Sequence, residues 1–222
     1  MRHPATQVLY TYWNELRGNR TAPRRLDIQP ARIADLLLDT FILERTDGAT
    51  FRSRLAGTRV AARLGLELKS QSFLSCWGDG DRALLSHHMV AIADLGRVGV
   101  FTAEAERLDD RGQWRARGQS STFEMIVLPL VHSGETIDRL LCHLVELDPQ
   151  DASPGGSIRR LRLVAAETVS PGGGMPADTT RFAERSASAE DRQLPLHPHV
   201  RTARIVRQGH RQFRVYEGGQ ST

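Results

Sequence analysis

Lysine, cysteine and long apolar runs are scarce in this chain of 222 residues. The two cysteines, Cys76 and Cys142, provide neither a disulfide framework nor the spaced ligands of a zinc site. Lys69 is the only lysine, so arginine supplies nearly all the positive charge. No run of about 18 or more apolar residues occurs, which argues against a transmembrane helix. Asn14 and Glu15 interrupt the first apolar stretch, so it does not form a signal-peptide core, and a reducing cytoplasm is the simplest compartment.

Motifs of nucleotide binding and catalysis are also missing. The glycines at 172–174 do not follow a strand-to-helix turn and lack the Lys-Ser/Thr of a phosphate loop. No Gly-x-Ser-x-Gly elbow is present. The acid pairs Asp79/Asp81 and Asp109/Asp110 sit in turn sequences, where capping explains them. We therefore predict no catalytic residue and no enzymatic activity; a small enzyme is the least supported reading.

The net positive charge is confined to the C-terminal third of the chain. Residues 1–150 carry 19 basic and 19 acidic side chains, whereas residues 151–222 carry 11 and 7, which accounts for the whole net charge of +4. A hydrophobic content of 40% with 25% charged residues is typical of a globular protein. The basic character therefore belongs to the C-terminal segment and not to the predicted core.

The most regular pattern lies between residues 35 and 65. The apolar run from Leu36 to Arg45 predicts a core strand. Asp47-Gly48 is a tight-turn signal, and Phe51 to Leu55 alternates as a half-buried strand does. Thr58 can then cap a short helix that ends at Gly65. The sequence thus predicts a hairpin that leads directly into a helix.

This segment resembles the opening of a PAS domain, in particular the PAS-like family common in alphaproteobacteria. The matching residues are Leu36-Leu37, Phe41-Ile42-Leu43-Glu44, Phe51-Arg52, Arg54-Leu55, Gly57-Thr58, Val60 and Leu64-Gly65 with Glu67-Leu68. The similarity extends from about Leu9 to Asp148. It implies a sheet whose concave face and overlying helices enclose an apolar pocket, but it specifies neither ligand nor output.

Period and turns predict the remaining elements of the domain independently of that resemblance. A helix is expected from Asp81 to Leu95, followed by strands at Val100–Leu108, Arg117–His132 and Ile137–Leu147. Pro129 cannot donate a ladder hydrogen bond, so we expect an edge position or a bulge there. The fold class is α+β, with a PAS-like five-stranded antiparallel sheet and helices on one face, an N-terminal amphipathic helix and a partly disordered C-terminal extension.

The N-terminal helix has an apolar, aromatic face that must be buried. Its residues are Val8, Leu9, Tyr12, Trp13 and Leu16. This face either packs on the protein's own sheet or forms a dimer or partner interface, and the sequence leaves both alternatives open.

The predicted organisation has three parts. Residues 1–25 form a flanking helix and connector, residues 26–148 a PAS-like domain, and residues 149–222 an extension. In the extension, Ile158 to Ala165 fits an extra strand, Ser170 to Pro195 has the composition of a disordered stretch, and residues 200–217 fit a basic hairpin.

Single residues that suggest chemistry have simpler explanations. His87 and His88 are adjacent on a helix and point about 100° apart, so they do not readily share a metal ion. His197 and His199 lack a third ligand nearby in sequence. Cys76 lies outside the Asn-Cys-Arg-Phe setting of the flavin-reactive PAS subgroup and reads as a buried structural cysteine. No metal and no cofactor is required by the sequence.

The function we predict is a non-enzymatic PAS-type sensory or protein-interaction module in bacterial cytoplasmic signalling. Its partners would be a second copy or other signalling proteins, with an optional small-molecule ligand. An alternative is an adaptor that binds nucleic acid or an anionic surface through Arg201, Arg204, Arg207, Arg211 and Arg214, although these lack a recognition helix and stacking aromatics. The predicted pocket residues are Phe41, Leu55, Leu64, Trp77, Met89, Phe101 and Met125.

Overall fold

The computed structural model divides the chain into two units, Met1–Thr180 and Arg181–Thr222. It describes residues 1–64, 72–106, 121–147, 158, 160–172, 200–208 and 211–218, the last two ranges by their backbone alone. Several expectations concern residues outside these ranges: the turn at 109–112, the boundary at 149–157, the disordered stretch beyond residue 172, and His197 and His199.

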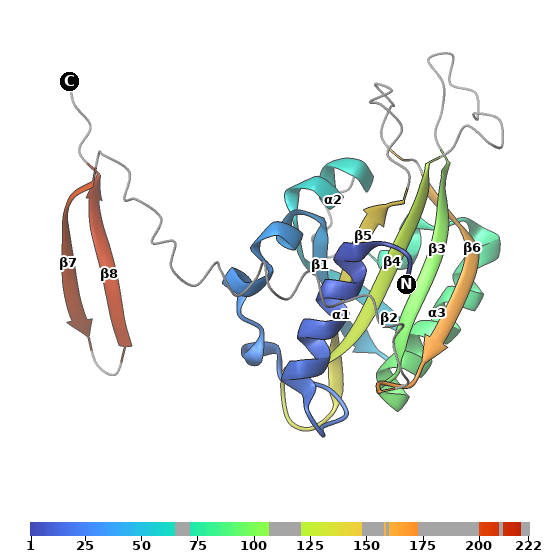
Figure 1. The fold of residues 1–222 in the computed structure, drawn as a ribbon, viewed down its shortest axis with the longest axis horizontal. Helices are drawn as coiled ribbons and strands as arrows, with labels where there is room; N and C mark the ends of the chain where they lie inside the picture. Colours follow the sequence, from blue (N-terminus) through green and yellow to red (C-terminus); the bar gives the residue numbers. More distant parts are fainter. Residues whose placement is uncertain are drawn as a thin grey trace, which may run out of the picture. The chain divides into compact units, whose positions relative to one another are not determined.

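In the first unit, the described residues form a six-stranded antiparallel sheet (Figure 1). From one edge to the other, its strands are β2 (Thr50–Ala56), β1 (Thr40–Asp47), β5 (Ile137–Glu146), β4 (Thr122–Val131), β3 (Val98–Glu106) and β6 (Arg160–Val169). Strands β4 and β5 are central, and the N-terminal hairpin β1–β2 lies beside β5 and not beside β3.

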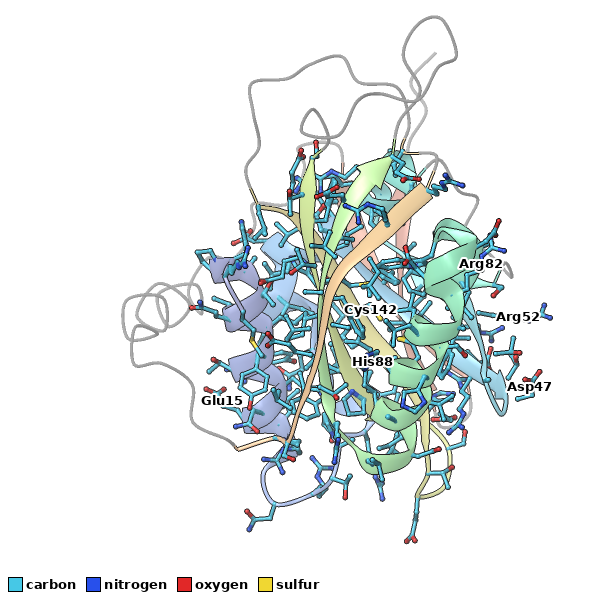
Figure 2. All side chains as sticks on the ribbon, turned by 90° about the vertical axis from the view of Figure 1, so that its right-hand side faces the viewer. Glu15, Asp47, Arg52, Arg82, His88 and Cys142 are labelled. Carbon is cyan, nitrogen blue, oxygen red and sulfur yellow. The ribbon has the colours of Figure 1, made fainter. Side chains whose placement is uncertain are left out.

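Helices cover both faces of this sheet. They are α1 (Pro4–Arg17), the 3-10 segments η1 (Arg25–Asp27) and η2 (Pro30–Asp39), then α2 (Thr58–Leu64), η3 (Phe73–Cys76) and α3 (Asp79–Leu95). Figure 2 views the sheet along its edge and shows α1 on one side and α3 on the other. The order of elements therefore produces three layers, with the sheet in the middle.

Two apolar layers meet at strand β4. The inner layer, on the side of α2, η3 and α3, receives Phe123, Met125 and Val127. The outer layer, on the side of α1, receives Ile126 and Leu128, which alternate with them. Successive side chains of a strand point to opposite faces, so a strand covered on both sides reads as the continuous apolar run seen in the sequence.

The predicted α+β fold with an antiparallel sheet is confirmed, with two differences. The sheet has a sixth strand because β6 pairs along β3, at the place where Ile158 to Ala165 fitted an extra strand. Helices lie on two faces instead of one because α1 packs on the face opposite α3. Both elements therefore belong to the same compact unit as the rest of the sheet.

The first strand begins later than its apolar run suggested. Leu36, Leu37 and Leu38 belong to the 3-10 segment η2, and β1 starts at Thr40. The end of η2 lies so close to the chain after β2 that a Cβ added at Gly57 would stand 2.1 Å from the Leu37 carbonyl oxygen. Only glycine fits this approach, which explains the residue found between strand and helix.

Pro129 lies in the central strand β4 and not at an edge. The β3–β4 pairing ends at Gly99 and Val127, so Pro129 stands beyond the part of the ladder that would need its missing N–H. A register shift against β5 follows directly, between Leu130 and Val131. The Pro129 carbonyl accepts a hydrogen bond from Trp13 Nε1 at 2.8 Å, which connects this irregular place to α1.

The second unit contains a two-stranded antiparallel pair, β7 (Val200–Gln208) and β8 (Arg211–Gly218). Its position coincides with the alternating pattern of residues 200–217. Its arginines give this unit its positive charge, as counted from the sequence.

Candidate functional site

The inner layer brings together six of the seven predicted pocket residues. They come from β1, α2, the η3–α3 junction, α3, β3 and β4, and none is more than 5% exposed. The six are Phe41, Leu64, Trp77, Met89, Phe101 and Met125. Segments that are distant in sequence thus form one apolar compartment between the sheet and its helices.

Aromatic rings connect the two walls of this compartment. The Phe41 ring on β1 lies 5.4 Å from the Phe73 ring of η3, and Phe73 lies 6.0 Å from Trp77 in an edge-to-face arrangement. Such pairs add about 0.5–1.5 kcal/mol to the stabilisation from burial. Trp77 Nε1 is buried and has no hydrogen-bond partner among the described residues. An indole N–H in this position could donate to an acceptor within the compartment.

Leu55 is the predicted pocket residue that the structure places elsewhere, and its assignment to the pocket is corrected. It is 56% exposed. The pairing of β2 with β1 shifts between Ser53, opposite Leu43, and Leu55, opposite Ile42. This bulge inserts Arg54 as an extra residue and turns Leu55 from the inner face to the outer one.

The two thiols and His88 are packed in this compartment or at its border. Burial raises the pKa of the Cys76 thiol to about 11 and raises that of the Cys142 thiol well above its ordinary value, so both are unreactive. The His88 ring stands edge-on to Phe101 at 5.8 Å, and burial lowers its pKa. Among the described residues, no cluster of three or more potential metal ligands occurs. Packing therefore accounts for these side chains.

The aromatic face of α1 packs on the protein's own sheet. Leu9 and Trp13 are fully buried and Tyr12 is 6% exposed, whereas Val8 and Leu16 are partly exposed. This geometry favours the first of the two alternatives that the sequence left open. While α1 is docked, the three buried side chains are not available to a partner, and only the other two can contribute to one.

Polar side chains buried beneath α1 were not found by sequence reasoning. Glu124 on β4 is 1% exposed. Its two carboxylate oxygens accept hydrogen bonds from the backbone N–H groups of Arg2 and His3, at 2.6 and 3.1 Å. Glu124 therefore fixes the start of α1 to the sheet, and the helix dipole adds to this attraction. The available signal was a carboxylate inside the apolar run from Phe123 to Leu130.

His143 on β5 is the second of these groups. It is 1% exposed, and its Nδ1 lies 3.2 Å from Thr40 Oγ1. Its Nε2 has no hydrogen-bond partner among the described residues, nor has Thr6 Oγ1 on α1. Burial lowers the pKa of His143 to about 4, despite the opposing effect of Asp39. His143 is therefore neutral at pH 7.

Asp39 at the end of η2 completes the polar groups of this face. Its carboxylate is 7% exposed and is held by Arg59 at 2.6 Å and by Arg63 at 2.8 Å, both on α2. The Arg63 guanidinium also lies 5.9 Å from the centre of the Phe123 ring. These contacts fix α2 and η2 relative to each other next to His143.

Comparison with known proteins gives one match. A family model described as a PAS domain matches residues 1–145, which contain α1, β1 to β4 and nearly all of β5. No curated protein matches the chain. Among the described residues, no helix has the length and apolar character needed to cross a membrane.

Proposed function

The chain belongs to the PAS domain family, and we propose that it is a non-enzymatic sensory or protein-interaction module of bacterial cytoplasmic signalling. The observation that carries the proposal is the construction of β4. Met125 and Val127 face the inner compartment, while Ile126 and Leu128, which alternate with them along the strand, support α1. A change of packing on one face therefore reaches the other through the same strand.

The direction of signalling follows from the contacts of α1. The helix runs along β4, from the Glu124 carboxylate at its beginning to the Pro129 carbonyl at Trp13. A shift of β4 changes both anchors at once, because each is made by that strand. We propose that a signal acts by shifting the balance between docked and displaced α1.

A ligand of the inner compartment would be apolar, with one hydrogen-bond acceptor for Trp77 Nε1. Native mass spectrometry of freshly purified protein tests this directly. An additional small mass that is lost on denaturation supports a ligand-binding sensor and identifies the compound. If the wild-type protein carries no such mass and the Trp77→Phe variant gives the same mass spectrometric result, the ligand-binding hypothesis is contradicted and the interaction role remains.

The interaction role assigns a partner to α1, either a second copy or another signalling protein. The test is removal of residues 1–18, followed by measurement of the mass in solution. A lower oligomeric state supports α1 as an interface. A mass that falls only by that of the removed residues contradicts it. Exposure of the outer sheet face in this variant can itself cause aggregation, so Val8→Ser/Leu16→Ser, which keeps the buried side chains Leu9, Tyr12 and Trp13 on the sheet, is the matched control.

The charge distribution supports a second candidate, an adaptor for nucleic acid or an anionic surface. The excess of basic over acidic side chains lies entirely in residues 151–222. Phosphate binding by such residues weakens steeply with salt. We expect Arg201→Ser/Arg204→Ser/Arg207→Ser to abolish salt-sensitive binding to a DNA duplex or to anionic vesicles. Binding that is insensitive to salt and to these substitutions would exclude this function.

A further inference from the structure

We propose that protonation of His143 releases α1 from the sheet, so that the domain carries a built-in response to acid. As a signal this release rests on the proposed function, but as a physical event it can be measured alone. It follows from where His143 lies, which hydrogen bonds it makes and which groups surround it.

His143 lies under the first turns of α1. On the sheet it pairs with Ile126 of β4, two residues after Glu124. Glu124 holds the backbone at Arg2 and His3, and α1 then follows β4 toward Pro129. With a rise of about 1.5 Å per residue in a helix and 3.3 Å in a strand, Thr6 stands at about the level of the pair His143–Ile126.

The hydrogen bonds determine the tautomer of His143. Thr40 Oγ1 donates its hydrogen to the Leu36 carbonyl at 2.7 Å. The contact between Thr40 Oγ1 and His143 Nδ1 then requires that Nδ1 carries the hydrogen and donates. The neutral ring therefore keeps a bare Nε2, which is buried and has no donor among the described residues. At low pH, the additional proton would therefore bind to Nε2.

Within the part of the chain that the structure describes, the carboxylates closest to this charge already have partners. Asp39, the anion that acts on His143, already binds Arg59 and Arg63, and Glu124, two residues from the strand partner Ile126, binds two backbone N–H groups. Two neighbouring groups oppose protonation of His143, the Arg63 guanidinium of α2 and the His3 ring at the start of α1. A charged His143 therefore needs water, and displacement of α1 is a way to admit water without breaking the ladder between β4 and β5.

The sign of the effect follows from linkage. The docked His143 has a pKa of about 4, below its ordinary value of 6.5, because of burial. Docking is therefore fully favourable above pH 6.5 and is lost progressively as the pH falls toward 4. If displacement of α1 returns the pKa of His143 to this ordinary value, the docking constant is about 30-fold smaller at pH 5 than at pH 7.5.

The test is hydrogen exchange measured by mass spectrometry on the full chain at pH 7.5 and pH 5, compared as protection factors. We expect protection in residues 4–17 to fall by about 30-fold at pH 5, while residues 122–131 and 137–146 stay protected. His143→Asn keeps a donor near Nδ1 and cannot be charged, so its α1 should not respond to pH. His87→Asn, at an exposed position of α3, should respond as wild type.

Three results would overturn the inference. They are an α1 that stays protected at pH 5 in the wild type, a release that persists in His143→Asn, and a loss of protection in the strands together with α1. If His143→Asn does not fold, NMR titration of the wild-type histidine decides, since a pKa near 6.5 contradicts the proposal. If α1 does not respond to pH, the proposed sensory role is unaffected. That role is tested separately, by native mass spectrometry for a bound ligand and by removal of residues 1–18.

Discussion

The two faces of the PAS sheet are built from different chemistry. The inner layer is closed by aromatic rings and aliphatic side chains, and its buried polar residue is Ser53. The outer layer is also apolar, but Glu124 and His143 are buried in or beside it together with Thr6, Thr40 and Asp39. Apolar packing is insensitive to pH and tolerant of small shifts, whereas buried polar groups need defined partners. The comparison suggests that the inner face supplies stability and the outer face controls the position of α1.

The largest effect should come from the inner face. Phe41→Ala removes a ring that contacts Phe73 and leaves a cavity, for which we expect a loss of about 3–5 kcal/mol in the free energy of unfolding. Urea denaturation measures it. Leu55→Ala, on the neighbouring strand but 56% exposed, is the control and should change stability by about 0.5 kcal/mol or less. Similar losses in the two variants would contradict the division between the faces.

The second prediction concerns the anchor of α1. Glu124→Gln removes the negative charge and one of two acceptors for the N–H groups of Arg2 and His3. We expect a loss of about 1–3 kcal/mol in the docking of α1, seen as faster hydrogen exchange in residues 4–17 with little change in the strands. Glu15→Gln on the exposed side of the same helix is the matched control. Equal destabilisation of the strands would show that Glu124 supports the whole fold.

The sequence predicted the residues of the inner layer better than those of the outer layer. Six of the seven residues predicted for the pocket lie in the inner layer, because apolar alternation is a local property of each strand. The prediction for Leu55 was wrong because a bulge reverses the alternation of the strand, and the sequence around Arg54 does not indicate the extra residue. The prediction of a strand at Leu36–Leu38 was wrong because a short apolar run fits a 3-10 segment as well as a strand.

The outer site was largely beyond prediction from one sequence. The apolar face of α1 was recognised, but two surfaces were available to bury it, and periodicity does not choose between them. Glu124 and His143 are each surrounded by apolar residues in the sequence, which indicates burial of a polar group. Their partners are the backbone at Arg2 and His3 and the hydroxyl of Thr40, more than 100 residues away in sequence. Such contacts exist only in the folded chain.

The third prediction applies one substitution to both faces. Trp13 Nε1 donates to the Pro129 carbonyl, whereas Trp77 Nε1 has no partner among the described residues. Both substitutions lose ring volume, but Trp13→Phe also leaves a buried carbonyl unpaired, and Trp77→Phe removes an unpaired N–H. We expect Trp13→Phe to cost about 1–2 kcal/mol more than Trp77→Phe in urea denaturation. A larger cost for Trp77→Phe would mean that its N–H has an acceptor in solution, such as a bound ligand.

The smallest effect should come from two threonines of α1. Thr6 Oγ1 is buried without a partner among the described residues, whereas Thr11 Oγ1 donates to the Gln7 carbonyl at 2.9 Å. Valine has nearly the shape and helix propensity of threonine, so Thr→Val isolates the hydroxyl. We expect Thr6→Val to leave α1 docking unchanged or to strengthen it by up to about 1 kcal/mol, because an unpaired buried hydroxyl is lost. Hydrogen exchange of residues 4–17 measures this, with Thr11→Val as the control. A clear weakening in Thr6→Val would show that the hydroxyl is paired in solution, with His143 Nε2, the other unpaired buried atom of the outer face among the described residues, as the candidate acceptor.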